Sequence, residues 1–196
     1  MRVLLATRNA KKLTELRRIL ADEIEVVGLD DVAAYPEEPE TGATFADNAL
    51  IKARAGARAT GLATVADDSG IAVDAMNGMP GVLSARWSGR HGDDRANLEL
   101  LLGQLADTPD ERLGARFVCA AALVRPGGSE VVTEGVMPGR LVREPRGSNG
   151  FGYDPIFVPD GFSVTSAELS AEEKDAISHR GQALRALVPH LTAPGS

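Results

Sequence analysis

The chain has 196 residues, of which 43% are hydrophobic, and its formal net charge at pH 7 is −7. This length and composition suit one globular domain, or one domain with two lobes, and no apolar stretch approaches the roughly 20 residues that a membrane-spanning helix needs. The acidic balance argues against binding along a nucleic-acid polymer, which favours a basic surface. A small anionic ligand is still compatible with this charge, because it requires only a local group of cations.

The cysteine content indicates a reducing compartment. Cys119 is the only cysteine, so no intrachain disulfide can form. Its apolar neighbours in the segment 117–121 predict that it is buried. The first residues do not resemble a signal peptide, and we therefore expect a cytoplasmic protein.

Apolar runs and helical spacing alternate through the first half of the chain. Residues 2–7, 24–27 and 63–66 are typical of buried strands. Leucines at helical spacing from Leu13 to Leu20 predict a helix. Thr44–Asp47 has the form of a capping box and predicts the start of a second helix.

The second half of the chain is richer in strands. Residues 116–124 and 130–136 are expected to pair through a turn at 126–128, and 135–139 has the composition of another turn. We expect three further helices, at residues 93–105, 170–176 and 178–187. The order of these elements predicts a mixed α/β protein.

Cations cluster where the first strand meets the first helix, in the segment 7–12. Thr7 and Asn9 can cap the helix, whereas Lys11 and Lys12 fall in its first turn, where the helix dipole disfavours each positive charge by about 0.3–1 kcal/mol. A bound anion would reverse that sign, because backbone N–H groups, dipole and lysines would all face it. The segment therefore predicts either a phosphate site or a solvated basic turn. It is not a Walker loop, because the multiple glycines are missing.

Two adjacent carboxylates, Asp67 and Asp68, follow the expected strand at 63–66 and precede Ser69 and Gly70. Neighbouring side chains at a strand end project in different directions, so one carboxylate could bind a metal while the other orients it or activates water. Mg²⁺ favours such oxygen ligands. The alternative is an Asp-rich turn. The Asp-x-Asp spacing of covalent aspartyl phosphatases is absent here.

Aromatic residues gather in a glycine-rich segment at residues 148–155. Phe151 and Tyr153 lie among Gly150 and Gly152, in a chain with only 4% aromatic residues. Glycines let the backbone approach a flat ligand, and an aromatic face can stack on a base. The segment therefore predicts a base-binding loop, and the alternative is a tight hairpin with Phe151 in the core.

The last basic cluster combines Lys174 with Ser178, His179 and Arg180. Ser178 can cap the final helix, which places the next two residues in its first turn. Two helix starts thus carry cations that the dipole disfavours unless an anion is present. The alternative for His179 is an ordinary surface residue.

Six motifs follow one another along the chain, at residues 6–12, 41–53, 66–70, 80–86, 150–155 and 173–181. Together they resemble the Ham1-type inosine/xanthosine triphosphate pyrophosphatase family from end to end. The resemblance implies an α/β fold in which an elongated mixed sheet flanked by helices forms two lobes around a central cleft, within a single domain at residues 1–196. It also implies a homodimer that hydrolyses dITP, ITP and XTP to the monophosphate and pyrophosphate with Mg²⁺.

The resemblance further implies roles for individual residues. Asp68 would accept a proton and bind Mg²⁺ together with Glu40, and Asp67 and Lys52 would complete the catalytic group. The triphosphate would be bound by Thr7, Asn9 and Lys12 with help from Lys52, and the substrate-binding segment would also include Arg8, Ala10 and Lys11. Ser69 would contact the nucleotide, and Phe151, Gly152, Tyr153 and Asp154 would line the base and sugar pocket. The remaining base and phosphate contacts would come from Lys174, His179 and Arg180.

Two positions leave this assignment open. Arg8 stands where several family members have a glycine, so it either adds a cation beside the phosphates or faces solvent. Glu37 and Glu38 lie close to Glu40 in the sequence, and either could replace it as the metal ligand.

Two other functions fit parts of the pattern. A Maf-like pyrophosphatase acting on pyrimidine or other modified nucleotides shares the architecture, but the motifs at 151–154 and 178–180 argue against it. A non-hydrolytic nucleotide-sensing module would bind nucleotides without releasing pyrophosphate, and the pair Asp67 and Asp68 argues against it.

Overall fold

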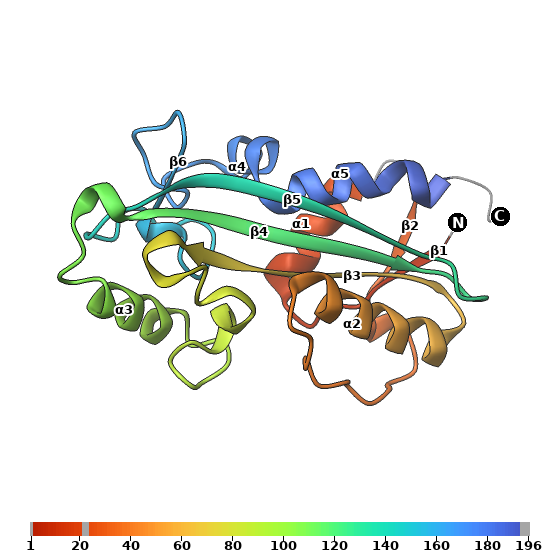
Figure 1. Ribbon diagram of the computed structural model, residues 1–196. Coiled ribbons are helices and arrows are strands. Elements are labelled where there is room, and N and C mark those ends of the chain that lie inside the picture. Colours follow the sequence, from red (N-terminus) through yellow and green to blue (C-terminus); the bar gives the residue numbers. More distant parts are fainter. Residues whose placement is uncertain (1, 21–23, 193–196) are drawn as a thin grey trace. The chain divides into compact units, whose positions relative to one another are not determined.

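The computed structural model describes residues 2–20 and 24–192. In this part of the chain, one six-stranded sheet has the order β2-β1-β3-β4-β5-β6 (Figure 1). The strands are β1 (Arg2–Leu5), β2 (Glu25–Val27), β3 (Ala63–Val73), β4 (Gly114–Val124), β5 (Glu130–Leu141) and β6 (Phe157–Pro159). The α-helices are α1 (Ala10–Leu20), α2 (Phe45–Thr60), α3 (Asp94–Gln104), α4 (Ala171–Ile177) and α5 (His179–Thr192). No helix in this part of the chain is long and apolar enough to span a membrane.

The sheet is mixed. Strand β1 pairs in parallel with β2, where Val3 lies opposite Val26, and with β3, where Leu4 lies opposite Thr64. Parallel neighbours need crossover connections, which α1 and α2 supply. Strands β5 and β6 are antiparallel, with Arg140 opposite Val158. The predicted α/β class is therefore confirmed.

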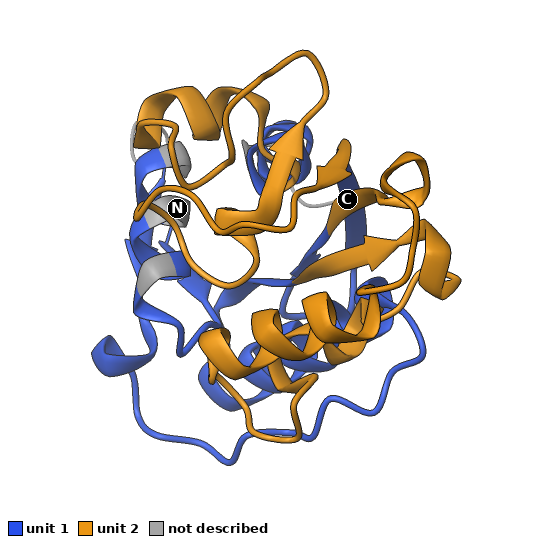
Figure 2. Cartoon of the chain, turned by 90° about the vertical axis from the view of Figure 1, so that its left-hand side faces the viewer, with its two compact units in different colours: residues 1–68, 119–135, 180–196 blue, residues 69–118, 136–179 orange. Residues whose placement is uncertain are grey.

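The chain forms two compact units, coloured separately in Figure 2. Unit 1 comprises residues 1–68, 119–135 and 180–196, and unit 2 comprises residues 69–118 and 136–179. Each unit has its own apolar core. The boundaries fall inside β3, β4 and β5, so each of these strands contributes residues to both units.

The core of unit 1 has two sides, because successive strand residues point to opposite faces of a sheet. Val65 of β3 packs in a cluster with Leu184 of α5 and Leu13 of α1. The next residue, Ala66, packs in a second cluster with Ala53 of α2. Helices α1 and α5 therefore cover one face of these strands, and α2 covers the other. Cys119 is fully buried on the first face, as predicted.

The core of unit 2 forms around α3. Leu98, Leu101 and Leu105 of this helix segment pack with Ile71 of β3 and Phe157 of β6. The helix begins after Asp93, whose side chain accepts a hydrogen bond from the Ala96 backbone N–H over 3.1 Å. An apolar helix face against an apolar strand face thus positions the elements that carry the aromatic loop.

The third strand is longer than the sequence indicated. Residues 63–66 were expected to end at Asp67, but β3 continues to Val73, and both Asp67 and Asp68 lie inside it. Their side chains are buried. The alternative of an Asp-rich surface turn is therefore wrong. Carboxylates can occupy a buried strand only when cations and donors compensate them, and local sequence does not show such partners.

The expected turn at 135–139 is also wrong, because β5 runs through it to Leu141. Gly139 lies opposite Pro159 of β6, and a side chain there would overlap the Val158 carbonyl oxygen. This glycine permits close strand approach and does not form a turn. The turn at 126–128 is confirmed by a hydrogen bond of 3.0 Å from Gly128 N–H to the Arg125 carbonyl oxygen.

The capping box at the start of α2 is confirmed. The Thr44 side chain accepts from the Asp47 backbone N–H over 3.1 Å, and the Asp47 carboxylate accepts from the Thr44 backbone N–H over 3.1 Å. This reciprocal pair fixes where α2 begins and hence which of its residues face β3.

Candidate active site

The segment 7–12 forms a helix start, as the sequence indicated. The Asn9 side chain accepts from the Lys12 backbone N–H over 3.3 Å, and Thr7 Oγ1 accepts from the Asn9 backbone N–H over 3.3 Å. Ala10 is the first residue of α1. The side chain of Lys11 lies outside the described residues. The segment therefore presents a capped helix N-terminus, with one described lysine side chain in its first turn.

That lysine reaches the first aspartate of β3. Lys12 Nζ donates to Asp67 Oδ2 over 2.9 Å, and Arg180 Nε donates to the same oxygen over 3.2 Å. Arg180 is 2% exposed, so this is a buried ion pair at the start of α5. Burial raises the pKa of Asp67, but the charges of Lys12, Arg180 and Lys52 outweigh it and hold the pKa well below its ordinary value. Asp67 is therefore ionised at neutral pH.

The second aspartate meets a different helix. Asp68 Oδ2 accepts from Asn48 Nδ2 over 3.1 Å, and Asp68 Oδ1 accepts from Lys52 Nζ over 3.3 Å. Lys52 Nζ also donates to Glu40 Oε1 over 2.9 Å. Burial raises the pKa of Asp68, and the charge of Glu40 adds to this, while Lys52 opposes it; the net direction is upward. Two carboxylates thus share one ammonium group.

The alternation of a strand explains this division. The side chain of Asp67 points to the same face of the sheet as Val65, the face covered by α1 and α5. The side chain of Asp68 points to the opposite face, with Ala66, and contacts α2. The two groups still interact, because Lys52 lowers the pKa of Asp67 as well as that of Asp68. Burial lowers the pKa of Lys52, but the negative charges of Asp68, Asp67 and Glu40 raise that pKa above its ordinary value. Lys52 is therefore protonated at neutral pH.

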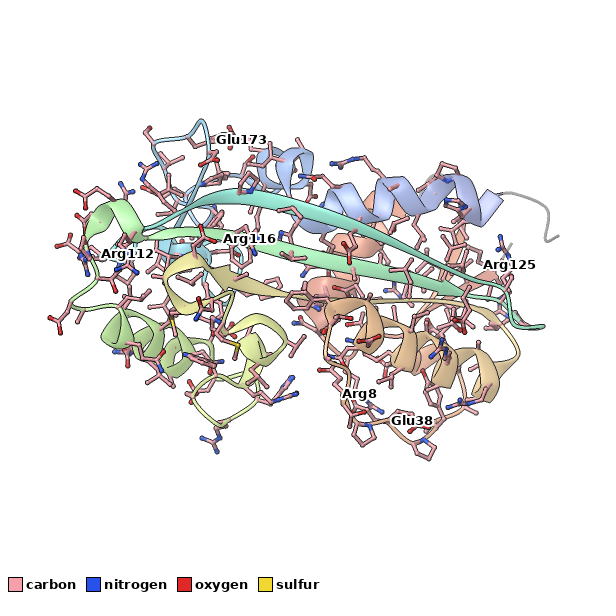
Figure 3. All side chains as sticks on the ribbon, viewed as in Figure 1. Arg8, Glu38, Arg112, Arg116, Arg125 and Glu173 are labelled. Atoms are coloured by element: carbon pink, nitrogen blue, oxygen red, sulfur yellow. The ribbon has the colours of Figure 1, made fainter. Side chains whose placement is uncertain are left out.

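The structure distinguishes the three glutamates of the loop before α2. Glu37 pairs with Arg8 over 3.1 Å, and Glu38 pairs with Arg58 over 3.1 Å, with exposed side chains in both pairs. Arg8 and Glu38 are labelled in Figure 3. Only Glu40 of the three is bonded to Lys52, next to Asp68. The geometry therefore favours Glu40 as the carboxylate beside Asp68 and directs Arg8 toward Glu37.

The aromatic loop of unit 2 forms a second polar group. Lys174 Nζ donates to Asp154 Oδ2 over 2.5 Å, and the Phe151 backbone N–H donates to the same oxygen over 2.9 Å. Lys174 Nζ also lies 5.5 Å from the centre of the Phe151 ring. Phe151 is half-buried and no hairpin forms here, so the alternative of a hairpin with Phe151 in the core is wrong. The ring is positioned by a buried carboxylate and a lysine.

His179 is not a surface residue, so that alternative is wrong as well. It is 5% exposed, and its ring stacks on Phe117 with centroids 4.9 Å apart. Tyr153 and Asp154 are buried, whereas Ser69 and Gly152 are half-buried. Ser178 immediately precedes α5 and is fully buried, and its role as a cap of that helix stays a prediction.

Sequence reasoning gave no role to Asn48, which the structure places at the centre of the Asp68 group. Its side-chain oxygen accepts from the Gly42 backbone N–H over 2.8 Å, while its amide nitrogen binds Asp68. It thereby ties the loop that carries Glu40 to β3. A signal existed, because Asn48 and Lys52 are four residues apart and lie on one face of a helix.

Known proteins are similar to the chain over almost all of its length. The sequence profile of the Ham1 family matches residues 3–190. A dITP/XTP pyrophosphatase of Nocardia farcinica is 67% identical over 98% of this chain and 95% of its own length. A dITP/XTP pyrophosphatase of Streptomyces coelicolor is 61% identical over 96% of both chains.

Solved structures of similar proteins have the same fold as this chain. The crystal structure of a nucleoside-triphosphatase, or dITP/XTP pyrophosphatase, from Mycobacterium abscessus has a TM-score of 0.80 at 67% identity and covers 96% of this chain and 100% of its own. A HAM1 protein from Coxiella burnetii has a TM-score of 0.89 at 42% identity and covers 98% of both chains. With sequence, fold and site motifs in agreement over the same residues, the chain belongs to the Ham1 family.

Proposed function

We propose that this protein hydrolyses deaminated purine nucleoside triphosphates, namely dITP, ITP and XTP, to the nucleoside monophosphate and pyrophosphate, and so removes them from the nucleotide pool. Relatives at 60% identity and above are named dITP/XTP pyrophosphatases. The observation that carries the proposal is the double group at β3, where Asp67 and Asp68 each meet a lysine from a different helix.

The triphosphate is assigned to the start of α1 and to the lysines. Thr7, Asn9 and Ala10 offer side-chain and backbone hydrogen bonds at the positive end of a helix dipole, where anions bind. Lys12 and Lys52 add positive charge, and both already face carboxylates. Because phosphate oxygens resemble carboxylate oxygens as acceptors, the same ammonium groups can turn to a triphosphate. Arg8 and Lys11 are proposed as further cations of this segment.

A divalent metal ion, proposed to be Mg²⁺, fits Asp68 and Glu40. Mg²⁺ takes oxygen ligands and uses one or two carboxylates, with water and substrate phosphates completing its coordination. The charge of Glu40 raises the pKa of Asp68, and a cation shared by both would relieve this repulsion. Among the residues that the structure describes, the buried Asp67 Oδ1 has no hydrogen-bond partner, so this oxygen can accept a hydrogen bond from a bound ligand. In residues 2–20 and 24–192, no group of three or more His, Cys, Asp or Glu is arranged to hold a metal by itself.

When bound, Mg²⁺ would neutralise charge on the phosphate oxygens. The residues of this chain supply the remaining chemistry. Water attacks the α-phosphorus, its oxygen forms a bond to phosphorus, and the bond to the β-phosphate oxygen breaks. Asp68 accepts the proton of that water as a general base. Lys12 and Lys52 neutralise the departing pyrophosphate, while Asp67 stays ionised and keeps Lys12 in place.

The base is assigned to Phe151, which can stack on a purine, and to a set of hydrogen-bond donors. A 6-oxo group accepts hydrogen bonds, whereas the 6-amino group of adenine donates them. A donor facing adenine would be left unpaired, at a cost of roughly 1–3 kcal/mol for a buried group. Lys174, His179 and Arg180, with backbone N–H groups of the loop, are the proposed donors. Gly152, Tyr153, Asp154 and Ser69 complete the proposed nucleoside contacts.

Pyrophosphate release from a panel of triphosphates, with Mg²⁺ and with a chelator, tests the function. We expect metal-dependent release from dITP, ITP and XTP and much slower release from ATP. GTP is the hardest comparison, because guanine also carries a 6-oxo group. Equal kcat/KM for ATP and ITP would contradict the donor arrangement. Preference for pyrimidine triphosphates would indicate a Maf-like activity, and binding without release would indicate a sensor.

We further infer that the protein acts as a homodimer, as a single domain with two lobes, in the cytoplasm. Light scattering coupled to gel filtration measures the oligomeric state directly. A molar mass equal to that of one chain at micromolar concentration would contradict the dimer.

A further inference from the structure

The loop that carries Phe151 is held by hydrogen bonds to two distant segments of unit 2. The Gly152 backbone N–H donates to Asp94 Oδ2 over 3.0 Å, across 58 residues of sequence. The Tyr153 hydroxyl donates to the Ser84 carbonyl oxygen over 2.8 Å, across 69 residues. Asp94 is the first residue of α3, and Ser84 lies in the 3-10 helix η3 (Gly81–Arg86). The direction in which the loop presents Phe151 therefore depends on these tertiary contacts.

Asp94 is available for this contact because another residue caps its helix. The Asp93 side chain accepts from the Ala96 N–H and is the N-cap of α3. The carboxylate of Asp94 is directed instead to the Gly152 N–H. An ionised acceptor forms a stronger hydrogen bond to a backbone N–H than a neutral one does.

Gly152 needs such a restraint. Its φ is +63°, a left-handed conformation, and apart from its chain neighbours no described atom lies within 4 Å of the position where a side chain would begin. Glycine populates left-handed and right-handed conformations about equally, so steric contact at this position does not force the left-handed one. Two hydrogen bonds act on this turn: the Gly152 N–H donates to Asp94, and the Asp154 N–H donates to the Phe151 carbonyl oxygen over 3.3 Å. Because Gly152 follows Phe151 directly, rotation at Gly152 would loosen the link between Phe151 and the buried Tyr153.

The charge of Asp94 also acts on Tyr153, the next residue of the loop. Burial raises the pKa of the Tyr153 hydroxyl, and the negative charge of Asp94 adds to that rise. Asp94 thus lies close to two successive loop residues.

We propose that Asp94 is a positioning residue for base recognition, which holds Gly152 so that Phe151 presents its ring face to the purine. This inference rests on the proposed function. Asp94 acts through the backbone of Gly152. Its removal should weaken binding of the base and leave the chemical step nearly unchanged, which raises KM more than it lowers kcat.

The test compares Asp94→Ala with Asp94→Asn in steady-state hydrolysis of dITP and dGTP. Alanine removes the acceptor, and we expect KM for dITP to rise about tenfold with kcat within about twofold of wild type. The preference for dITP over dGTP should fall as well. Asparagine keeps a side-chain oxygen that can accept from Gly152, and we expect KM within about threefold of wild type.

Asp93→Ala is the matched control, because it removes the cap of the same helix without touching the loop. It should lower the melting temperature and leave KM unchanged. An Asp94→Ala enzyme with wild-type KM and selectivity would overturn the proposal, as would an equal rise in KM in Asp93→Ala.

Amide hydrogen exchange over residues 148–153 separates this inference from the proposed function. Faster exchange in Asp94→Ala than in wild type supports the restraint, and unchanged exchange contradicts it, whatever the substrate is. If the wild type hydrolysed no deaminated purine triphosphate, the proposed function would fail while the exchange data would still decide whether Asp94 holds the loop.

Discussion

Arg180 and Asp67 are 113 residues apart in the sequence, yet Arg180 Nε donates to Asp67 Oδ2 over 3.2 Å in the interior of unit 1. Lys12 donates to the same oxygen. The cations at the starts of α1 and α5, which the helix dipole disfavours, are therefore compensated by one buried carboxylate of β3. Asp67 therefore compensates the positive charge at these two helix starts even before a triphosphate binds.

The effects of substituting Arg180 and Asp67 on the free energy of unfolding should depend on each other. Removing Arg180 leaves Asp67 buried with Lys12 alone, so we expect Arg180→Met to lower the free energy of unfolding by about 3–5 kcal/mol. Asp67→Asn should also destabilise the protein, but the double variant should lose less than the two single losses together, by about 0.5–3 kcal/mol. Urea unfolding of the four proteins measures this cycle, and strictly additive losses would contradict the coupling.

Asp68→Asn should lower kcat by about 100-fold or more, because the amide cannot accept the proton of the attacking water. Binding of dITP should largely survive, since Lys12 and Lys52 remain. Asp74→Asn is the matched control: it follows the same strand, but Asp74 forms an exposed pair with Arg116. Turnover of Asp68→Asn at the wild-type rate would remove this residue from the mechanism.

The choice among three glutamates can be tested by metal titration. Glu40→Gln should raise the Mg²⁺ concentration for half-maximal activity by about tenfold or more, because Glu40 is the glutamate next to Lys52 and Asp68. Glu37→Gln and Glu38→Gln should leave it unchanged, since these side chains pair with Arg8 and Arg58. A shift in Glu37→Gln or Glu38→Gln of the same size would identify another ligand.

Stability without divalent metal should fall in acid because of Asp67. Burial raises its pKa, but its cationic neighbours lower it further, so the folded state favours the ionised form. This contribution is complete above the unfolded pKa of about 3.9 and is lost as the pH falls through the folded-state value. Urea unfolding in a chelator at pH 7 and pH 3 should show the loss, and the loss should be smaller in Asp67→Asn. An equal loss in both proteins would assign it to other groups.

Substitution by alanine should lower the stability of the protein at one glycine and raise it at another. Gly139→Ala places a methyl group against the Val158 carbonyl oxygen of β6, and we expect a loss of about 1–3 kcal/mol. Gly103 lies in α3, and outside the nearby backbone of that helix no described atom lies within 4 Å of a new Cβ, so Gly103→Ala should stabilise by about 0.5–1 kcal/mol. Thermal melting of both variants checks the pair. A stable Gly139→Ala protein would argue against the β5 and β6 pairing.

The sequence by itself predicted elements that depend on neighbouring residues. The capping box at Thr44–Asp47, the helix that starts after Asn9 and the turn at 126–128 are all confirmed, because their hydrogen bonds join residues at most four apart. The α/β class also followed from the order of these elements. The residues proposed for the site were chosen from motifs, and their roles in binding and catalysis stay predictions.

Only the tertiary structure decided what lies around the carboxylates and the aromatic loop. By local sequence, Asp67 and Asp68 read as a strand end, because two buried charges are costly unless partners compensate them. Those partners come from three helices, so no local window contains them. The hydrogen bond between Gly152 and Asp94 likewise joins residues that are far apart in the sequence. Burial and charge balance depend on contacts between distant residues, and these exist only once the chain has folded.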